Sequence, residues 1–183
     1  ERQADYYRAH ALDHFSSYIE TNKGLKIPIP KEFVTVNDTA DFFWLMRDKA
    51  HLSEHIFYYE EDYISKDQLT LNHIIETRNT VGKAKIFGEI NGTYMSTETR
   101  FPEVYPLIDT ISVSGQFALR TRGWWKMEND FLGGYFIRYT FVDERRSKVI
   151  HVETALYSPK YDKMFYLREL ESILNGIEFS KAN

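Results

Sequence analysis

Apolar and polar residues alternate along the chain between residues 116 and 157, and two polar stretches interrupt the pattern. A period of two is typical of a strand that buries one of its faces. The first interruption is Asn129-Asp130, which favours a turn because both side chains can bond their own backbone, and the second is the charged run 143–147. The pattern therefore predicts a β-meander of three antiparallel strands, at 116–127, 135–142 and 148–157.

Three further segments repeat apolar residues at helical spacing. The first predicted helix, Asp5 to Glu20, is followed by Gly24, which can take the left-handed conformation after a last turn. The second, Thr70 to Val81, begins at a threonine that can cap it. The third begins at Ser158-Pro159, with serine as the cap and proline in the first turn, and ends before Gly176.

Shorter strands are predicted between the helices, with a turn at Asn37-Asp38 and a loop bounded by Pro102 and Pro106. They lie at 33–36, 41–47, 56–63 and 94–100. Runs of strands separated by helices indicate an α+β fold. We expect a mainly antiparallel sheet with helices packed on its faces, an α/β/α sandwich. At 183 residues, one domain spanning 1–183 is the default.

The composition excludes several classes of protein. An apolar share of 43% is enough for a core, and a formal net charge of −4 argues against a nucleic-acid partner. There is no cysteine for a disulfide or thiolate site, and no apolar run is long enough to cross a bilayer. The chain starts at Glu1 and not at Met, so we expect a mature or truncated product.

His51, Glu54 and His55 form the pattern H-x-x-E-H, the inverted zinc-peptidase signature. That chemistry needs both imidazoles on one side of a helix, with the glutamate activating a zinc-bound water. Here the motif lies between two strand-like aromatic runs, which favours a hairpin turn over a helix. His10 and His14, four residues apart on the first predicted helix, are a second, weaker pattern for a metal.

Arg120, Arg122 and Trp124 share one face of the first meander strand. Arginine offers a planar fork for a carboxylate or phosphate, and tryptophan offers a stacking face. With Glu98 and Arg100, these three are our candidate ligand contacts. The structural alternative is that the arginines pair across strands with Glu98 or Glu153 beneath a helix, as charged pairs in sheets commonly do.

Trp124 and Trp125 suggest a further possibility, an aromatic platform for carbohydrate or peptidoglycan. No nucleophile elbow, phosphate loop or dinucleotide fingerprint occurs in the chain. We therefore expect no catalytic residue, no cofactor and no metal, with H-x-x-E-H as the alternative.

Four motifs carry a resemblance to a known family: YMSTETR at 94–100, RGWWK at 122–126, ENDFLGG at 128–134 and YSPKYDK at 157–163. Together they resemble an uncharacterised family of Bacteroidetes lipoproteins, known as a domain of unknown function. The chain is similar to the C-terminal half of longer members. The resemblance implies a periplasmic-facing or outer-membrane lipoprotein, with membrane contact only through a lipid outside this chain. The order of elements also resembles the PsbP-type sandwich.

These observations predict a non-catalytic, envelope-associated binding or assembly module. Its partner would be a protein, a small molecule or a glycan of the envelope. A zinc-dependent hydrolase using residues 51–55 and a carbohydrate- or peptidoglycan-binding domain are the alternatives.

Overall fold

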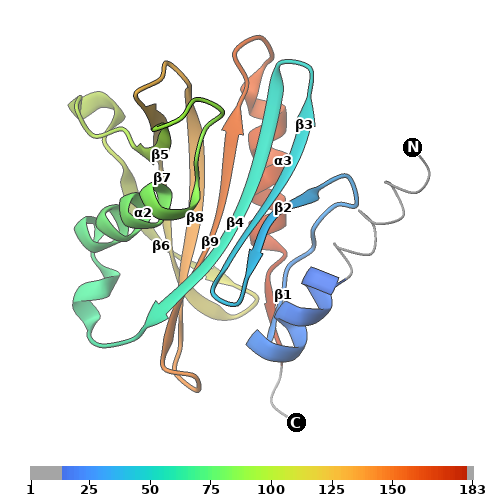
Figure 1. Ribbon diagram of the computed structural model, residues 1–183. Coiled ribbons are helices and arrows are strands. Elements are labelled where there is room, and N and C mark those ends of the chain that lie inside the picture. Colours follow the sequence, from blue (N-terminus) through green and yellow to red (C-terminus); the bar gives the residue numbers. More distant parts are fainter. Residues whose placement is uncertain (1–13, 181–183) are drawn as a thin grey trace.

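One large antiparallel sheet dominates residues 14–180, the part of the chain that the computed structural model describes (Figure 1). Its strand order is β2-β3-β4-β9-β8-β7-β5, and β6 also pairs with β7. The strands are β2 (Val34–Thr39), β3 (Phe42–Lys49), β4 (Leu52–Asp62), β5 (Tyr94–Thr97), β6 (Leu107–Val113), β7 (Gln116–Glu128), β8 (Gly133–Asp143) and β9 (Lys148–Tyr157). A separate pair joins β1 (Leu25–Lys26) to β10 (Glu178–Phe179).

Helices cover both faces of this curled sheet (Figure 1). One face carries α2 (Leu71–Lys85), and the opposite face carries α3 (Lys163–Asn175) together with the helical residues 14–23. Three short helical turns complete the described chain: η1 (Ile19–Lys23), η2 (Lys66–Leu69) and η3 (Pro102–Val104). The predicted α+β fold with a mainly antiparallel sheet is confirmed. None of the described helices is long and apolar enough to cross a membrane.

The predicted meander is confirmed as β7, β8 and β9, and two of the predicted helices are present as α2 and α3. Thr70 caps α2 as predicted, because its hydroxyl accepts from the amide of His73. The start of α3 was predicted wrongly. Asp162 caps that helix, and Ser158 lies four residues earlier, in the loop. Residues 5–13 of the predicted first helix lie outside the described residues, and residues 14–20 are helical.

Two of the predicted loops are strands. Asn37-Asp38 belongs to β2, and the turn to β3 follows at residues 40–41. The loop predicted after Pro102 contains η3 and then β6, which pairs with residues 116–122 of β7. The polar residues of β6 hid it from a search for apolar alternation, because β6 is an edge strand with solvent on one side.

Helix α2 approaches the sheet closely at Gly82. A Cβ at this position would overlap the carbonyl oxygen of Met95 in β5. The end of α2 is also hydrogen-bonded to β5, since the amide of Met95 donates to the Ile86 carbonyl over 2.9 Å and that of Thr97 to Asn79 Oδ1 over 2.8 Å. These contacts fix α2 and the loop after it against one end of the sheet.

Candidate functional site

Strands β5 and β6 lie end to end along the same edge of β7, and the chain leaves this edge between them. Residues 107–113 of β6 pair with residues 116–122 of β7, while β5 pairs with residues 125–128 of β7. The amide of Glu98 still bonds the Trp124 carbonyl over 2.8 Å, and the following residues then project outward as η3. The gap between two edge strands therefore presents side chains of a loop beside those of β7.

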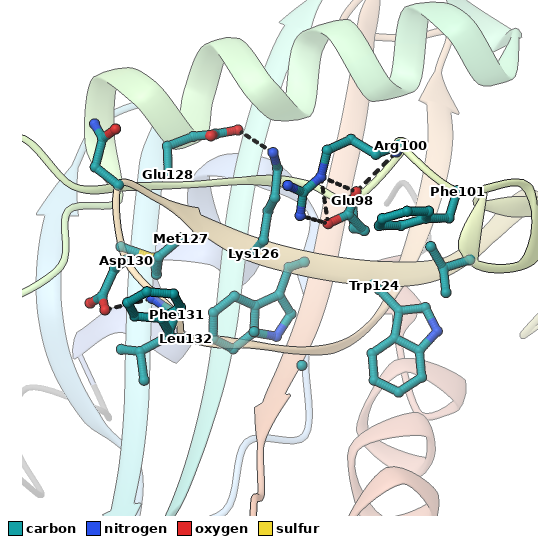
Figure 2. Close-up of a pocket in the computed structure, with 15 residues that line it drawn as sticks. Glu98, Arg100, Phe101, Trp124, Lys126, Met127, Glu128, Asp130, Phe131 and Leu132 are labelled. Carbon is teal, nitrogen blue, oxygen red and sulfur yellow. Dashed lines mark hydrogen bonds and ion pairs between the residues drawn. The ribbon is translucent and has the colours of Figure 1, made fainter.

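An open hollow of about 610 Å³ lies at this gap, and Figure 2 shows its side chains. We call it the β7 hollow. Its walls are the segment 98–104, residues 124–128 of β7, and the turn into β8 at 129–134. Of our candidate ligand contacts, Glu98, Arg100 and Trp124 line the hollow.

Three aromatic side chains expose surface around the β7 hollow. Trp124 is 37% exposed, Phe101 is 56% exposed, and Phe131 at the tip of the turn is fully exposed. The Trp124 ring is held in place because Tyr135 packs edge-on against it, with ring centroids 5.7 Å apart, and Lys163 Nζ lies 5.4 Å from its centroid. The hollow thus offers one aromatic face held by its neighbours and two more exposed rings for stacking.

The charged groups of the β7 hollow are paired with one another. Arg100 bonds both carboxylate oxygens of Glu98, at 2.5 to 3.2 Å, and Lys126 lies 2.8 Å from Glu128. Hydrogen bonding to the Arg100 guanidinium lowers the pKa of Glu98 to about 2, and Lys126 likewise lowers the pKa of Glu128. With Asp130, three carboxylates face two cations, so the hollow carries no excess positive charge for an anion.

Arg120 and Arg122 lie on the same face of β7 but not in the β7 hollow. Arg120 forms two bonds to Asp109 of β6, at 3.0 and 2.6 Å, and a third to Glu171 of α3 at 3.1 Å. Arg122 reaches only within 3.9 Å of Asp109. Arg120 is therefore paired across strands beneath a helix, as the structural alternative predicted. Its partners are Asp109 and Glu171, however, and not Glu98 or Glu153.

The predicted pairing of these arginines with Glu153 is wrong. Glu153 is opposite Arg138 in the β8–β9 register, and Arg138 is opposite Thr121 of β7. Since side chains alternate between faces, Glu153 lies with Thr121 on the α2 side, whereas Arg120 lies on the α3 side. The second alternative partner, Glu98, bonds Arg100 instead.

Trp125 cannot share an aromatic platform with Trp124, because successive side chains point to opposite faces. It is buried on the α2 side, where its indole N–H donates to the Leu156 carbonyl of β9 over 3.2 Å. To reach β9 the indole crosses β8 at Gly134, where a Cβ would collide with both groups. The Gly-Gly sequence at the start of β8 therefore allows close approach between strands.

The H-x-x-E-H residues do not converge. His51 is an exposed turn residue with φ 62°, and its Nε2 lies 3.1 Å from Lys160. Glu54 and His55 are neighbours in β4 and point to opposite faces. Glu54 is buried in a paired contact with Arg47, at 2.6 and 2.8 Å. No group of three metal-ligating side chains occurs in residues 14–180. The His10–His14 pattern lies partly outside that range.

Sequence reasoning missed four contributors to the β7 hollow: Phe101, Phe131, Lys126 and Glu128. Phe131 carried a usable signal, since a large apolar residue directly after Asn-Asp must sit at the tip of a turn, exposed. Phe101 follows a strand and precedes a proline, which also places it in a loop. For Lys126 and Glu128, only the register against β5 shows that they meet there.

The family of the chain is clear from a comparison with protein-family models. A search of curated proteins gave no match. The model described as "Domain of unknown function (DUF4837)" matches residues 13–176, which includes the β7 hollow and both helices α2 and α3. This agrees with the resemblance of the four sequence motifs to a domain of unknown function. The chain belongs to the DUF4837 family.

Proposed function

We propose that this domain is a non-catalytic binding module that holds an uncharged, hydroxyl-rich ligand, such as a glycan, in the β7 hollow. The observation that carries the proposal is the combination of exposed aromatic faces with charged groups that already neutralise one another. An aromatic ring can pack against the apolar face of a sugar ring. Paired carboxylates and cations keep spare acceptors and donors for hydroxyl groups.

The charge balance supports an uncharged ligand over an anionic one. Every cation lining the β7 hollow already has a carboxylate partner within 2.8 Å. An anionic ligand would have to displace Glu98 from Arg100 or Glu128 from Lys126. A hydroxyl group does not have to break either pair, because a carboxylate oxygen accepts more than one hydrogen bond.

The same pairs support a non-catalytic role. A glycosidase needs one carboxylic acid that is still protonated near neutral pH. The pKa of Glu98 is instead lowered to about 2 and that of Glu128 is lowered as well, in each case chiefly through hydrogen bonds to a cation. Both side chains are then acceptors only.

The proposal includes a location. The motif resemblance to envelope lipoproteins supports a domain facing the periplasm or the outer surface, tethered by a lipid on a segment outside this chain. A glycan or another envelope component would be within reach of such a domain. Detection of the full-length protein in the cytoplasmic fraction, with no incorporated lipid label, would contradict this location.

A glycan array followed by calorimetry tests the binding function. We expect at least one neutral oligosaccharide to bind, and Trp124→Ala to weaken it by about tenfold, or about 1.4 kcal/mol. Phe117→Ala is the matched control, because Phe117 is an exposed aromatic of β7 at the far end from the hollow. Absence of binding to any neutral glycan, or equal loss in both variants, would overturn the proposal.

A further inference from the structure

A second cavity, of about 480 Å³, opens on the α2 side of the sheet. We call it the α2-side groove. Strands β3 and β4 form its floor with Trp44, Met46 and His55, and the loop after α2 forms one wall at residues 86–90. The turn between β7 and β8 forms another wall and separates this groove from the β7 hollow.

Apolar side chains dominate the α2-side groove, and four of them are exposed, among them Val36 of β2. Phe87, Ile90 and Leu132 keep a large part of their surface in solvent, although Ile86, Met95 and Met127 beside them are buried. Exposed apolar side chains grouped around a concavity are typical of a ligand site. The groove would therefore accept the apolar part of a ligand.

A hydrogen-bonded chain of three side chains lies in the floor of the groove. The Trp44 indole nitrogen is 3.1 Å from His55 Nδ1, and His55 Nε2 is 3.0 Å from Ser53 Oγ. An indole N–H can only donate, so Nδ1 must accept. Burial lowers the pKa of His55 to about 4, which keeps the ring neutral with its proton on Nε2.

This protonation state decides what Ser53 can do. Because His55 Nε2–H donates to Ser53 Oγ, the imidazole cannot take the serine proton as a general base. The pair is therefore not a nucleophilic dyad. The Ser53 hydroxyl proton has no other acceptor among the hydrogen bonds of residues 14–180, so it is available to an oxygen of a ligand.

Charge distinguishes the ligands that would fit. Three carboxylates line the α2-side groove, those of Asp48, Glu89 and Asp130, and no lysine or arginine does. Within the described chain, Asp48 and Glu89 form no ion pair, whereas most carboxylates of the sheet do. A fatty acid would bring a fourth negative charge into this field, whereas an ammonium group would be attracted.

We propose that the α2-side groove binds a small cationic amphiphile. Its apolar chain lies against Trp44, Met46 and Ile90, and its ammonium group lies at the acidic border of the groove, beside Asp48 or Glu89. The Ser53 hydroxyl donates a hydrogen bond to a carbonyl or hydroxyl oxygen of the ligand, where the ligand carries one. This groove and the β7 hollow share Asp130 and Leu132 of the turn between them, whereas Trp124 lines only the hollow and Asp48 and Glu89 line only the groove. Variants of these last three residues therefore test the two proposals independently.

Calorimetric titration with three probes of equal chain length, decylammonium, decanol and decanoate, tests the proposal below the critical micelle concentration of the two ionic probes and below the solubility limit of decanol. We expect decylammonium to bind at least about tenfold more tightly than decanoate. In the double variant Asp48→Asn/Glu89→Gln, that preference should fall towards unity. Ile90→Ala should weaken decylammonium and decanol alike, because it removes apolar contact and no charge.

Two controls keep the outcomes distinct. Glu76→Gln removes an exposed carboxylate on α2 outside the groove and should leave the preference unchanged. Trp124→Ala should leave decylammonium binding unchanged, whatever it does to glycan binding. The proposal is overturned if decanoate binds as tightly as decylammonium, if none of the three probes binds, or if the double variant keeps the preference of the wild type. Circular dichroism of each variant checks that it is folded.

Discussion

Helices α2 and α3 pack on opposite faces of one sheet, but different chemistry holds each of them. The buried residues of α3 are Leu170, Ile173 and Leu174. Those of α2 are Ile74, Ile75, Arg78 and Gly82. The residues that α3 buries are thus all aliphatic, while those of α2 include a guanidinium group and a glycine.

Beneath α3, charged side chains lie beside the apolar cluster, and one pair among them, Arg47 with Glu54, is buried at 6% and 0% exposed. Arg47 and Arg120 reach carboxylates of α3, Glu169 and Glu171, that are about one-third exposed. The residues that α3 itself buries contact an aliphatic and aromatic cluster. Such contacts depend on area and close packing and have little directional preference.

Beneath α2, an ionic network is itself part of the core. Arg78, Arg138 and Glu153 are 4%, 0% and 2% exposed, and Glu153 accepts from both guanidinium groups at 2.8 to 3.1 Å. Arg138 also bonds the Ile74 carbonyl and the Tyr59 hydroxyl. Hydrogen bonds are directional, so this network sets the position of α2 along the sheet, and with it the wall of the α2-side groove that follows α2.

Glu153→Gln is expected to have the largest effect on stability. The variant keeps the shape of the side chain but leaves two buried arginines with no carboxylate between them. Breaking a buried ion pair from one side typically costs about 3–5 kcal/mol. Urea unfolding at pH 7, followed by circular dichroism, measures the loss.

Leu174→Ala is the matched change beneath α3, since Leu174 is fully buried. Removing a buried leucine costs about 2–5 kcal/mol, depending on how well the site can relax. If Glu153→Gln lowers the free energy of unfolding by clearly less than Leu174→Ala does, the network does not hold α2 in the way we describe.

The contrast between the two faces also explains which parts of the fold the sequence could predict. Aromatic and β-branched residues indicated β8, and period-two alternation indicated β7, which has one apolar face. Alternation could not tell which residues of β9 belong to which face, because residues 149–156 are all buried. A shift of one residue exchanges the faces of a strand, and Glu153 was therefore assigned to the arginines of the wrong face.

The candidate site was predictable in part for a similar reason. Trp124, Glu98 and Arg100 were found because they are chemically distinctive and near each other in the register of the sheet. Phe101 and Phe131 reach the hollow from loops, and no periodicity governs loop residues. The α2-side groove was missed because its floor consists of ordinary strand residues. Whether those residues are exposed depends on how much of the sheet α2 covers.

Acid pH should destabilise the α2 side through its buried histidines. Burial lowers the pKa of His55 and of His151 from 6.5 to about 4. Below pH 6.5 these histidines become protonated in the unfolded chain, whereas in the folded chain they stay neutral until the pH approaches 4. The free energy of unfolding therefore falls as the pH drops through this window. We expect a loss of about 2 kcal/mol per histidine between pH 7 and pH 5.

His55→Gln tests the assignment, because glutamine does not titrate. Urea unfolding at pH 7 and pH 5 should show about half the wild-type loss in this variant. Carboxylates contribute little to the difference between pH 7 and pH 5. The pKa of Glu61, for example, is lowered to about 2, and this shift affects stability only as the pH falls below the ordinary glutamate pKa near 4.5. An unchanged loss in His55→Gln would mean that the titrating groups lie elsewhere.

Arg120→Ala should have the smallest effect, although Arg120 makes more hydrogen bonds to carboxylates than most side chains of the sheet. Its three bonds join β6, β7 and α3. All three partners are in contact with solvent, however: Arg120 is 23% exposed, Asp109 40% and Glu171 31%. Water and salt screen such pairs, whose contribution is about 0–1 kcal/mol.

Arg120→Met distinguishes the contribution of the charge from that of the apolar part of the side chain. Methionine removes the charge but keeps the apolar length that packs on the sheet. We expect it to be as stable as the wild type to within a few tenths of a kcal/mol, and the remaining difference to shrink when unfolding is measured at high salt. A loss in Arg120→Met approaching that of Glu153→Gln would show that ions stabilise both faces equally. The distinction between the apolar packing of α3 and the ionic network that holds α2 would then fail.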